Sequence, residues 1–128
     1  KKKRLMVKPK SADSELISKI IFGIEDVKGA DVNIMDLTNI TNTVCGYFIV
    51  CTGTSNTHVA AIVSSIRKHV SKELKEKPFS VEGNENQEWV LIDYVNVVVH
   101  VFQREIREYY DIENLWGDAK ITNVELNA

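Results

Sequence analysis

The sequence predicts an α/β (α+β) fold, a mixed β-sheet with helices packed on it. Two long segments carry apolar residues at helical spacing, and short apolar runs bounded by turn residues lie between and after them. Helices and strands alternate only in the first half of the chain, whereas a hairpin dominates the second half. This order favours a mixed sheet over a purely parallel one.

The first half of the chain begins with an amphipathic segment from about Asp13 to Lys28, which predicts a helix. Alternating apolar residues in 32–37 indicate a short strand, and the polar stretch 38–43 is typical of a turn. The continuous apolar run 47–51 is typical of a central strand covered on both faces.

A second helix is expected after residue 54. Ser55 or Thr57 offers an N-cap, and apolar residues then recur at helical spacing with charged residues on the other face. The helix must end before Pro78, and 79–81 is a brief strand candidate.

Two strong strands follow, 89–92 and 97–102, with a tight hairpin connection over 93–96 because Asp and Asn favour turns. A last helix is expected to begin near Arg104, with a break around Asp111.

The chain of 128 residues suits one domain, expected over 13–118, with a flexible basic lead over 1–12 and a loose C-terminal tail over 119–128.

Six of the 16 basic residues lie in the first ten, so 11–128 carries ten basic and 18 acidic residues, a net charge of −8. A body this acidic suits a basic protein partner better than nucleic acid. Direct RNA contact is therefore expected only from the basic lead.

The two cysteines, Cys45 and Cys51, are expected to be reduced, buried thiols of a cytoplasmic protein. No second Cys pair or close His completes a zinc pattern, so no metal site is predicted. No apolar run approaches the ~20 residues of a membrane helix, and no apolar signal core follows the basic start.

The segment Thr52–Ser55 follows a strand and precedes a helix, a shape that can hold a phosphate. A nucleotidyltransferase would also need paired carboxylates for Mg²⁺, and no Asp-x-Asp or Glu-x-Glu occurs on a later strand. The Lys of a P-loop is missing too. We therefore expect a structural turn and helix cap, with a nucleotide-binding or nucleotidyltransferase-like enzyme as the alternative. No catalytic residue and no cofactor is predicted.

The three histidines, His58, His69 and His100, show no grouping with a nucleophile or an orienting carboxylate. A triad of Cys51, His100 and Asp93 would lack a nucleophile elbow. His100 is expected to be a hydrogen-bonded, half-buried residue of its strand.

Aromatic residues gather near the hairpin and the last helix: Trp89, Tyr94, Tyr109, Tyr110 and Trp116. Aromatic side chains are frequent anchors of protein interfaces, and the hairpin is expected to present Tyr94 outward. Acidic residues are interleaved with them and would attract basic protein surfaces: Asp93, Glu105, Glu108, Asp111, Glu113 and Asp118. A plain dimeric adaptor, associating through a sheet edge or the hairpin, is a further possibility.

Six segments, taken in order, resemble the ribosomal silencing factor (Iojap-like) family: YFIVCTGTS (47–55), HV (58–59), VEG (81–83), WVLIDY (89–94), VVVHVF (97–102) and REYYDIENLW (107–116). The match spans about residues 13–118. The Val-His-Val-Phe strand and the Tyr-Tyr…Leu-Trp ending are its most specific parts.

This resemblance implies a nucleotidyltransferase-like core that lacks the catalytic carboxylates. Family members bind the large ribosomal subunit through its fourteenth protein and sterically block the small subunit from joining, which represses translation under nutrient limitation. Organelle relatives assist large-subunit assembly. The implied protein is therefore a translation repressor and not an enzyme. The sequence itself is compatible with a homodimer in the free state.

Carried onto this chain, Trp89, Asp93 and Tyr94 match the family's strand-and-turn contact segment, and Tyr110 and Trp116 match its aromatic C-terminal segment. We expect these five residues to bind the partner. Two features depart from the family pattern: Gly46 replaces a usual Asp, and Val95-Asn96 replaces the usual Gly-Asp of the hairpin. Asn96 is expected to supply the positive φ that Gly would provide.

Overall fold

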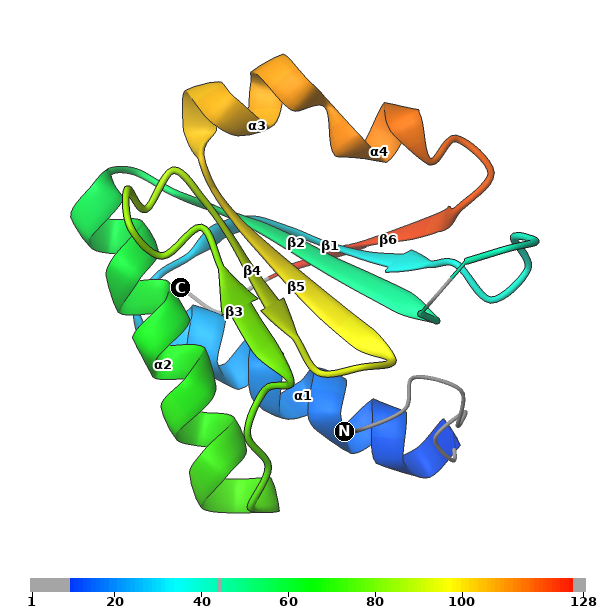
Figure 1. Ribbon diagram of the computed structural model, residues 1–128, viewed down its shortest axis with the longest axis horizontal. Helices are drawn as coiled ribbons and strands as arrows, with labels where there is room; N and C mark the ends of the chain where they lie inside the picture. The colour runs from blue at the N-terminus through cyan, green and yellow to red at the C-terminus, as the bar shows by residue number, and fades with distance from the viewer. Residues whose placement is uncertain (1–9, 44, 126–128) are drawn as a thin grey trace.

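The computed structural model describes residues 10–43 and 45–125, and it places a twisted sheet between two layers of helices (Figure 1). The described strands form one six-stranded sheet in the order β3-β4-β5-β2-β1-β6. The strands are β1 (Ala30–Asp36), β2 (Tyr47–Gly53), β3 (Ser80–Glu82), β4 (Trp89–Asp93), β5 (Val97–Gln103) and β6 (Lys120–Val124). The helices are α1 (Lys10–Asp26), α2 (Asn56–Leu74), α3 (Arg104–Tyr110) and α4 (Ile112–Leu115).

The sheet is mixed, which confirms the predicted fold class. The central strands β2 and β5 pair in parallel, whereas the other pairs are antiparallel. Helices cover both faces of this centre, with α1 and α2 below and α3 and α4 above in the view of Figure 1. Two-sided coverage explains why β5 is buried on both faces from Val97 to Phe102 and is apolar there except at His100.

Alternate residues of β5 serve two separate hydrophobic cores. Val97, Val99 and Val101 belong to the lower core, which lies between the sheet and α1 and α2. Phe102 and Val98 belong to the upper core, which lies between the sheet and α3 and α4. The two cysteines, both free and buried, are divided in the same way, Cys51 in the lower core and Cys45 in the upper one.

Close packing of α1 on α2 closes the lower core. A Cβ added to Gly23 would lie 2.7 Å from the Ile66 Cα atom, so only glycine permits this approach. The Ser65 hydroxyl donates a hydrogen bond of 2.7 Å to the Gly23 carbonyl, which satisfies a polar group inside the contact. At the start of α2, Ser55 is the N-cap and its hydroxyl accepts from the His58 N–H, which decides between the two predicted caps, Ser55 and Thr57.

The hairpin between β4 and β5 turns at Val95 and not at Asn96. Val95 has a φ of 80°, and the Asn96 N–H donates to the Tyr94 carbonyl across a three-residue turn. The expectation that Asn96 supplies the positive φ is therefore wrong. The Asp93 carboxylate accepts a hydrogen bond of 2.8 Å from the Val95 N–H and holds the backbone in this strained form.

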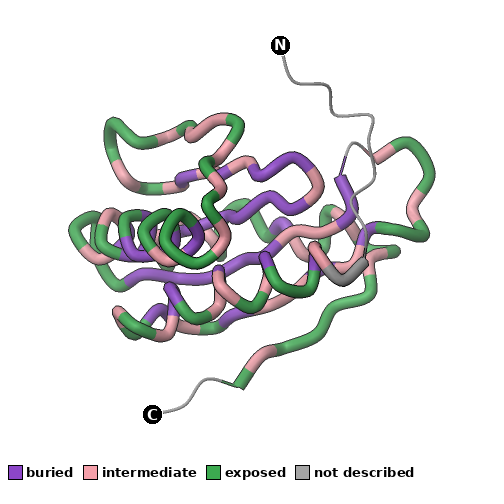
Figure 2. The backbone as a smooth tube through the Cα atoms, turned by 90° about the horizontal axis from the view of Figure 1, so that it is seen from below, coloured by how far each residue is buried: buried purple, intermediate pink, exposed green. Residues whose placement is uncertain are grey.

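Both ends of the domain differ from the prediction. Helix α1 begins at Lys10, so residues 10–12 are helical and the flexible lead cannot extend to residue 12; residues 1–9 lie outside the described residues. The prediction of a loose tail over 119–128 is wrong for β6, which pairs with β1. Strand β6 lies at the edge of the sheet and is mostly exposed (Figure 2), so its sequence shows no alternation of buried and exposed residues. Residues 126–128 are not described.

We expect Val95→Gly to be more stable than Val95→Ala by about 1 kcal/mol, because both variants lose the two methyl groups of Val95 but only alanine keeps a Cβ at positive φ. At Val98, inside β5, we expect the opposite order: Val98→Ala should be more stable than Val98→Gly by a similar amount. Urea unfolding of the four variants measures both differences. If alanine is the more stable residue at both positions, Val95 does not carry the backbone strain described.

Candidate functional site

A row of aromatic rings crosses the upper face of the sheet and continues onto α3. The ring centroids lie 5.6 Å apart for Trp116–Phe48, 4.4 Å for Phe48–His100, 6.0 Å for His100–Trp89, 4.9 Å for Trp89–Tyr110 and 5.0 Å for Tyr110–Tyr109. These distances are those of rings in direct contact. We call these six residues the aromatic row.

The aromatic row is buried at its centre and exposed at one end. Tyr110 is 51% exposed and Tyr109 is 80% exposed, both on α3. Leu115 on α4 is 77% exposed. The rings of Tyr109 and Tyr110 are in contact, and a contiguous exposed apolar patch, unlike a single exposed residue, is typical of an interaction surface.

Trp89 joins the exposed end of the row to its buried centre. Its position on β4 lies opposite Phe102 on β5, and the two rings stack with centroids 4.8 Å apart. Its indole N–H donates a hydrogen bond of 3.1 Å to His100 Nδ1. The polar atom of Trp89 therefore points inward, and the half-buried ring offers mainly apolar surface to a partner.

His100 is a neutral residue of the upper core. Because its Nδ1 accepts from Trp89, the neutral ring carries its hydrogen on Nε2, which has no hydrogen-bond partner among the described residues. Burial lowers the pKa of His100 to about 4, with the nearby Glu113 carboxylate opposing this shift. His100 thus orients Trp89 and carries no charge near neutral pH.

A polar cluster around Arg107 fixes α3 and α4 on the sheet. The Arg107 guanidinium donates to the Asp31 carbonyl at 2.6 Å and the Thr52 hydroxyl at 2.8 Å, and it forms an ion pair with Glu113. The Asn33 amide donates to the same Glu113 carboxylate at 3.0 Å. We call these five residues the Arg107 cluster.

The ionisation of Glu113 supports this cluster. Burial raises the pKa of the Glu113 carboxyl, but the hydrogen bonds from Arg107 and Asn33 and the positive charge of Arg107 outweigh it. The net pKa lies below the ordinary value, so the ion pair persists at neutral pH. The exposed aromatic side chains of α3 are thereby held in a fixed position.

Polar groups of the Thr52–Ser55 corner are engaged in hydrogen bonds within the fold. The Thr52 hydroxyl accepts from Arg107, and the Ser55 hydroxyl caps α2. The Thr54 N–H donates to His58 Nδ1 at 2.9 Å, which leaves His58 Nε2 to donate to the Val27 carbonyl at 2.8 Å. These groups are used as structural contacts, which agrees with the expected turn and helix cap.

A Cys51–His100–Asp93 triad has no support in the geometry. Cys51 belongs to the lower core, whereas His100 lies on the opposite face of the sheet. Burial raises the pKa of the Cys51 thiol to about 12, with the positive charge of Arg107 opposing the shift. Within residues 10–43 and 45–125, no three His, Cys, Asp or Glu side chains are grouped to hold a metal ion.

The structure brings together three of the five predicted partner-binding residues. Trp89 and Tyr110 are in contact, and Trp116 joins the same row through Phe48. Asp93 faces the same side of the sheet, but one of its carboxylate oxygens is bound to the hairpin turn.

The fifth predicted residue, Tyr94, lies elsewhere. It is 2% exposed and packs in the lower core, so the expectation that the hairpin presents it outward is wrong. Strand alternation is the reason, because Tyr94 continues the face of Val90 and Ile92, whereas Trp89 belongs to the other face. Burial raises the pKa of Tyr94 to about 12, with Arg67 opposing and Glu76 adding to the shift.

Sequence reasoning did not select three residues of this surface. Leu115 and Phe48 occupy positions where an apolar residue is ordinary in a helix or strand. Arg107 is one of 16 basic residues, and no sequence pattern distinguishes it from the others. Only the contacts across the sheet show that Phe48 connects Trp116 to His100 and that Arg107 holds the helices.

A family model described as "Ribosomal silencing factor during starvation" matches residues 9–128. The chain belongs to the ribosomal silencing factor family. A ribosomal silencing factor of Chromobacterium violaceum is 43% identical over 105 residues, covering 81% of this chain and 84% of that protein.

An X-ray structure of a Chromobacterium violaceum protein superposes with a TM-score of 0.76 at 38% identity, covering 88% of this chain and 92% of that one. The mouse protein named "Mitochondrial assembly of ribosomal large subunit protein 1" is 36% identical over 73 residues, covering 55% of this chain and 32% of its own.

Ribosomal silencing factors are regulators of translation and not enzymes, and this chain shares that character. No helix within the described residues is long and apolar enough to cross a membrane. The structural hydrogen bonds of the Thr52–Ser55 corner and the exposed aromatic surface fit a protein that acts by binding.

The two departures from the family pattern lie against each other in the structure. A Cβ added to Gly46 would lie 3.0 Å from the Asn96 side chain, and the Asn96 carbonyl accepts from the Gly46 and Tyr47 N–H groups. The Asn96 amide donates to the Asp13 carboxylate at 2.9 Å. A small residue at 46 thus leaves room for Asn96 to connect the hairpin to α1.

We expect His100 to make the protein less stable in mild acid. The unfolded chain binds a proton at His100 below its ordinary pKa of 6.5, whereas the folded chain does so only near 4. The stabilisation is therefore complete above pH 6.5 and is lost as the pH falls toward 4. Between pH 7.5 and 4.5 the native chain should lose about 2–3 kcal/mol more than His100→Gln, measured by urea unfolding. An equal loss in both proteins would contradict a neutral, buried His100.

Proposed function

We propose that this ribosomal silencing factor binds the large ribosomal subunit through its fourteenth protein and blocks the small subunit from joining. Translation is thereby repressed under nutrient limitation, in the cytoplasm where the ribosomes work. The observation that carries this proposal is the aromatic row, with Trp89 packed against an exposed Tyr110 and Tyr109. Blocking of this kind needs only a bound domain of sufficient bulk.

The charge around the aromatic row supports a basic protein partner. Glu105, Glu108 and Asp111 are exposed on or beside α3, next to the protruding tyrosines. An acidic rim around apolar anchors attracts Lys- and Arg-rich protein surfaces and guides their orientation. The name of the mouse relative, which refers to assembly of the ribosomal large subunit, supports the choice of subunit.

The rigidity of the surface favours tight binding. The Arg107 cluster holds α3 in place, and His100 fixes the Trp89 ring, so little side-chain freedom is lost on docking. A typical interface buries roughly 800 Å² on each partner, about a tenth of the 7701 Å² of accessible surface here. Trp89, Tyr110 and Trp116, with the neighbouring Tyr109 and Leu115, would form its centre, and Asp93 would lie toward its rim.

The alternative function is nucleotide binding at Thr52–Ser55. The contacts at this corner argue against it, because Glu113 already neutralises the charge of Arg107 and the Ser55 hydroxyl already caps α2. Calorimetry with ATP, GTP and Mg²⁺ would reveal such binding. Self-association of the free chain through a sheet edge or the hairpin stays a prediction, which light scattering can test.

We expect Tyr110→Ala to weaken binding to purified large subunits by at least about tenfold, because it removes an exposed anchor without opening a core. Trp89→Ala should abolish co-sedimentation. Phe22→Ala is the matched control, since Phe22 is an aromatic residue of similar exposure, 53%, on α1. Sucrose-gradient sedimentation measures binding, and a subunit-joining assay measures the block.

A substitution at Tyr94 tests whether binding depends on the exposed surface or on the lower core. Tyr94→Phe removes a buried hydroxyl that has no hydrogen-bond partner in the described part of the chain, so binding should not change. Native-like binding by both Trp89→Ala and Tyr110→Ala would show that the assigned surface is wrong. Binding without any effect on subunit joining would refute the blocking mechanism alone.

A further inference from the structure

Basic residues of the domain body are concentrated in one segment. Residues 67–77 contain five of the ten basic residues of 11–128 and only two acidic ones, a net charge of +3. The remainder of 11–128 carries five basic and 16 acidic residues, a net charge of −11. The average charge of the body therefore hides a strongly basic segment at the end of α2 and in the connection to β3.

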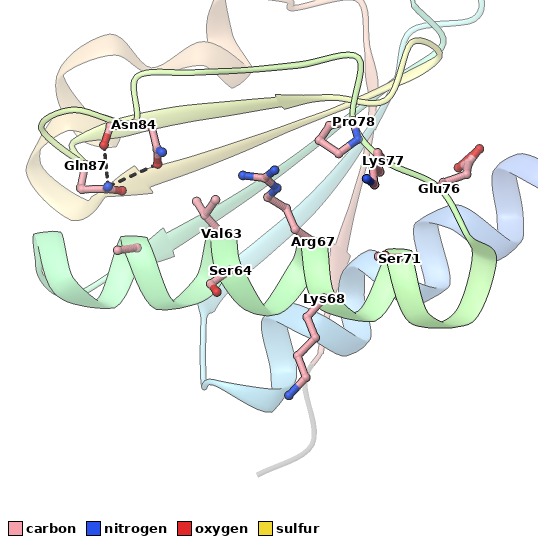
Figure 3. Close-up of a pocket in the computed structure, with 11 residues that line it drawn as sticks. Val63, Ser64, Arg67, Lys68, Ser71, Glu76, Lys77, Pro78, Asn84 and Gln87 are labelled. Atoms are coloured by element: carbon pink, nitrogen blue, oxygen red, sulfur yellow. Dashed lines mark hydrogen bonds between the residues drawn. The ribbon is translucent and has the colours of Figure 1, made fainter.

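This basic segment borders a groove of about 580 Å³ between α2 and the loop that joins β3 to β4. Figure 3 shows Arg67 pointing from α2 toward the strands, with Lys77 and Pro78 at one end and Asn84 and Gln87 at the other. The lining spans about three turns of α2, from Ala60 to Ser71, or roughly 16 Å of helix.

The groove offers hydrogen-bond donors without apolar anchors. Its polar lining consists of Arg67, Lys68, Lys77, Ser64, Ser71, Asn84, Gln87 and one carboxylate, Glu76. Among the residues that the structure describes, no ion pair joins Arg67, Lys68 or Lys77 to a carboxylate. Their charges are therefore available to a ligand.

We propose that this groove binds the phosphodiester backbone of RNA. Arg and Lys, together with Ser, Asn and Gln side chains, are the groups that contact phosphate and sugar in nucleic-acid complexes. No aromatic ring lines the groove, so bases are not stacked there and binding is independent of sequence.

An acidic protein is a poorer occupant, because protein interfaces need large apolar anchors and this lining has only Ala60, Val63 and Pro78. The groove and the aromatic row flank the same edge of the sheet, since Gln87 lines the groove and Trp89, two residues later, lies on the opposite face. The choice of RNA rests on the proposed docking to the ribosome, where RNA would lie beside the protein partner.

Fluorescence anisotropy with a labelled RNA hairpin, at 50 to 200 mM salt, tests the groove apart from the ribosome. All proteins carry Gln at four basic residues of the start, so that these do not contribute: Lys1, Lys2, Lys3 and Arg4. We expect a dissociation constant on the order of 10⁻⁴ M near 150 mM salt.

The combined change Arg67→Gln and Lys77→Gln should weaken binding at least about tenfold and lower the salt slope by about 2. Glu76→Gln should strengthen binding. The matched control, Lys28→Gln with Lys120→Gln, removes two exposed cations outside the groove and should change binding less than twofold.

Each of these results would overturn the proposal: no binding at 50 mM salt, equal loss in the groove and control variants, or displacement by polyglutamate as effective as by unlabelled RNA. Displacement by ATP at equal phosphate concentration would indicate a small phosphate ligand and also overturn it. Tyr110→Ala should bind the hairpin normally. Suppose that Tyr110→Ala still binds large subunits while the groove variant no longer binds the RNA hairpin. The proposed docking surface would then be wrong, whereas the RNA-binding groove would be supported.

Discussion

The guanidinium of Arg107 joins three parts of the chain that lie far apart in sequence: the Asp31 carbonyl on β1, the Thr52 hydroxyl on β2 and the Glu113 carboxylate on α4. Helices as short as α3 and α4 have little stability of their own, and α3 has no fully buried residue. Polar contacts at Arg107, with Ile112 and Trp116 packed in the upper core, therefore hold this helical segment on the sheet. The position of the exposed tyrosines depends on that attachment.

The same contacts explain why the Thr52–Ser55 corner, whose strand-turn-helix shape could hold a phosphate, has a structural role in this protein. Thr52 and Ser55 are engaged by Arg107 and by the start of α2, so their hydroxyls position structural elements. His100 acts in a similar way, since its buried neutral ring accepts the Trp89 N–H and leaves the indole surface to a partner. Residue types that are common in active sites are used here to shape a binding surface.

Charge divides the domain into two regions with different partners. The acidic residues beside the aromatic row suit a basic protein, and the basic groove beside α2 suits phosphate groups. Both regions reach the edge of the sheet formed by β3 and β4. A domain held at two neighbouring sites gains affinity because the second contact becomes intramolecular once the first has formed.

The sequence by itself determined the elements other than β6, the mixed sheet and the two tryptophans as candidate anchors, because apolar periodicity and turn residues report local structure and burial. Tertiary structure decided what depends on neighbours distant in sequence. The alternation of β4 placed Tyr94 in the lower core and Trp89 above it, and Asp93 enforced a positive φ at Val95 that no local preference favours. Strand β6 is held by backbone pairing to β1, and the basic groove exists only where α2 meets the β3–β4 loop. Composition and periodicity carry no record of these contacts, because each is made by groups that only the folded chain brings together.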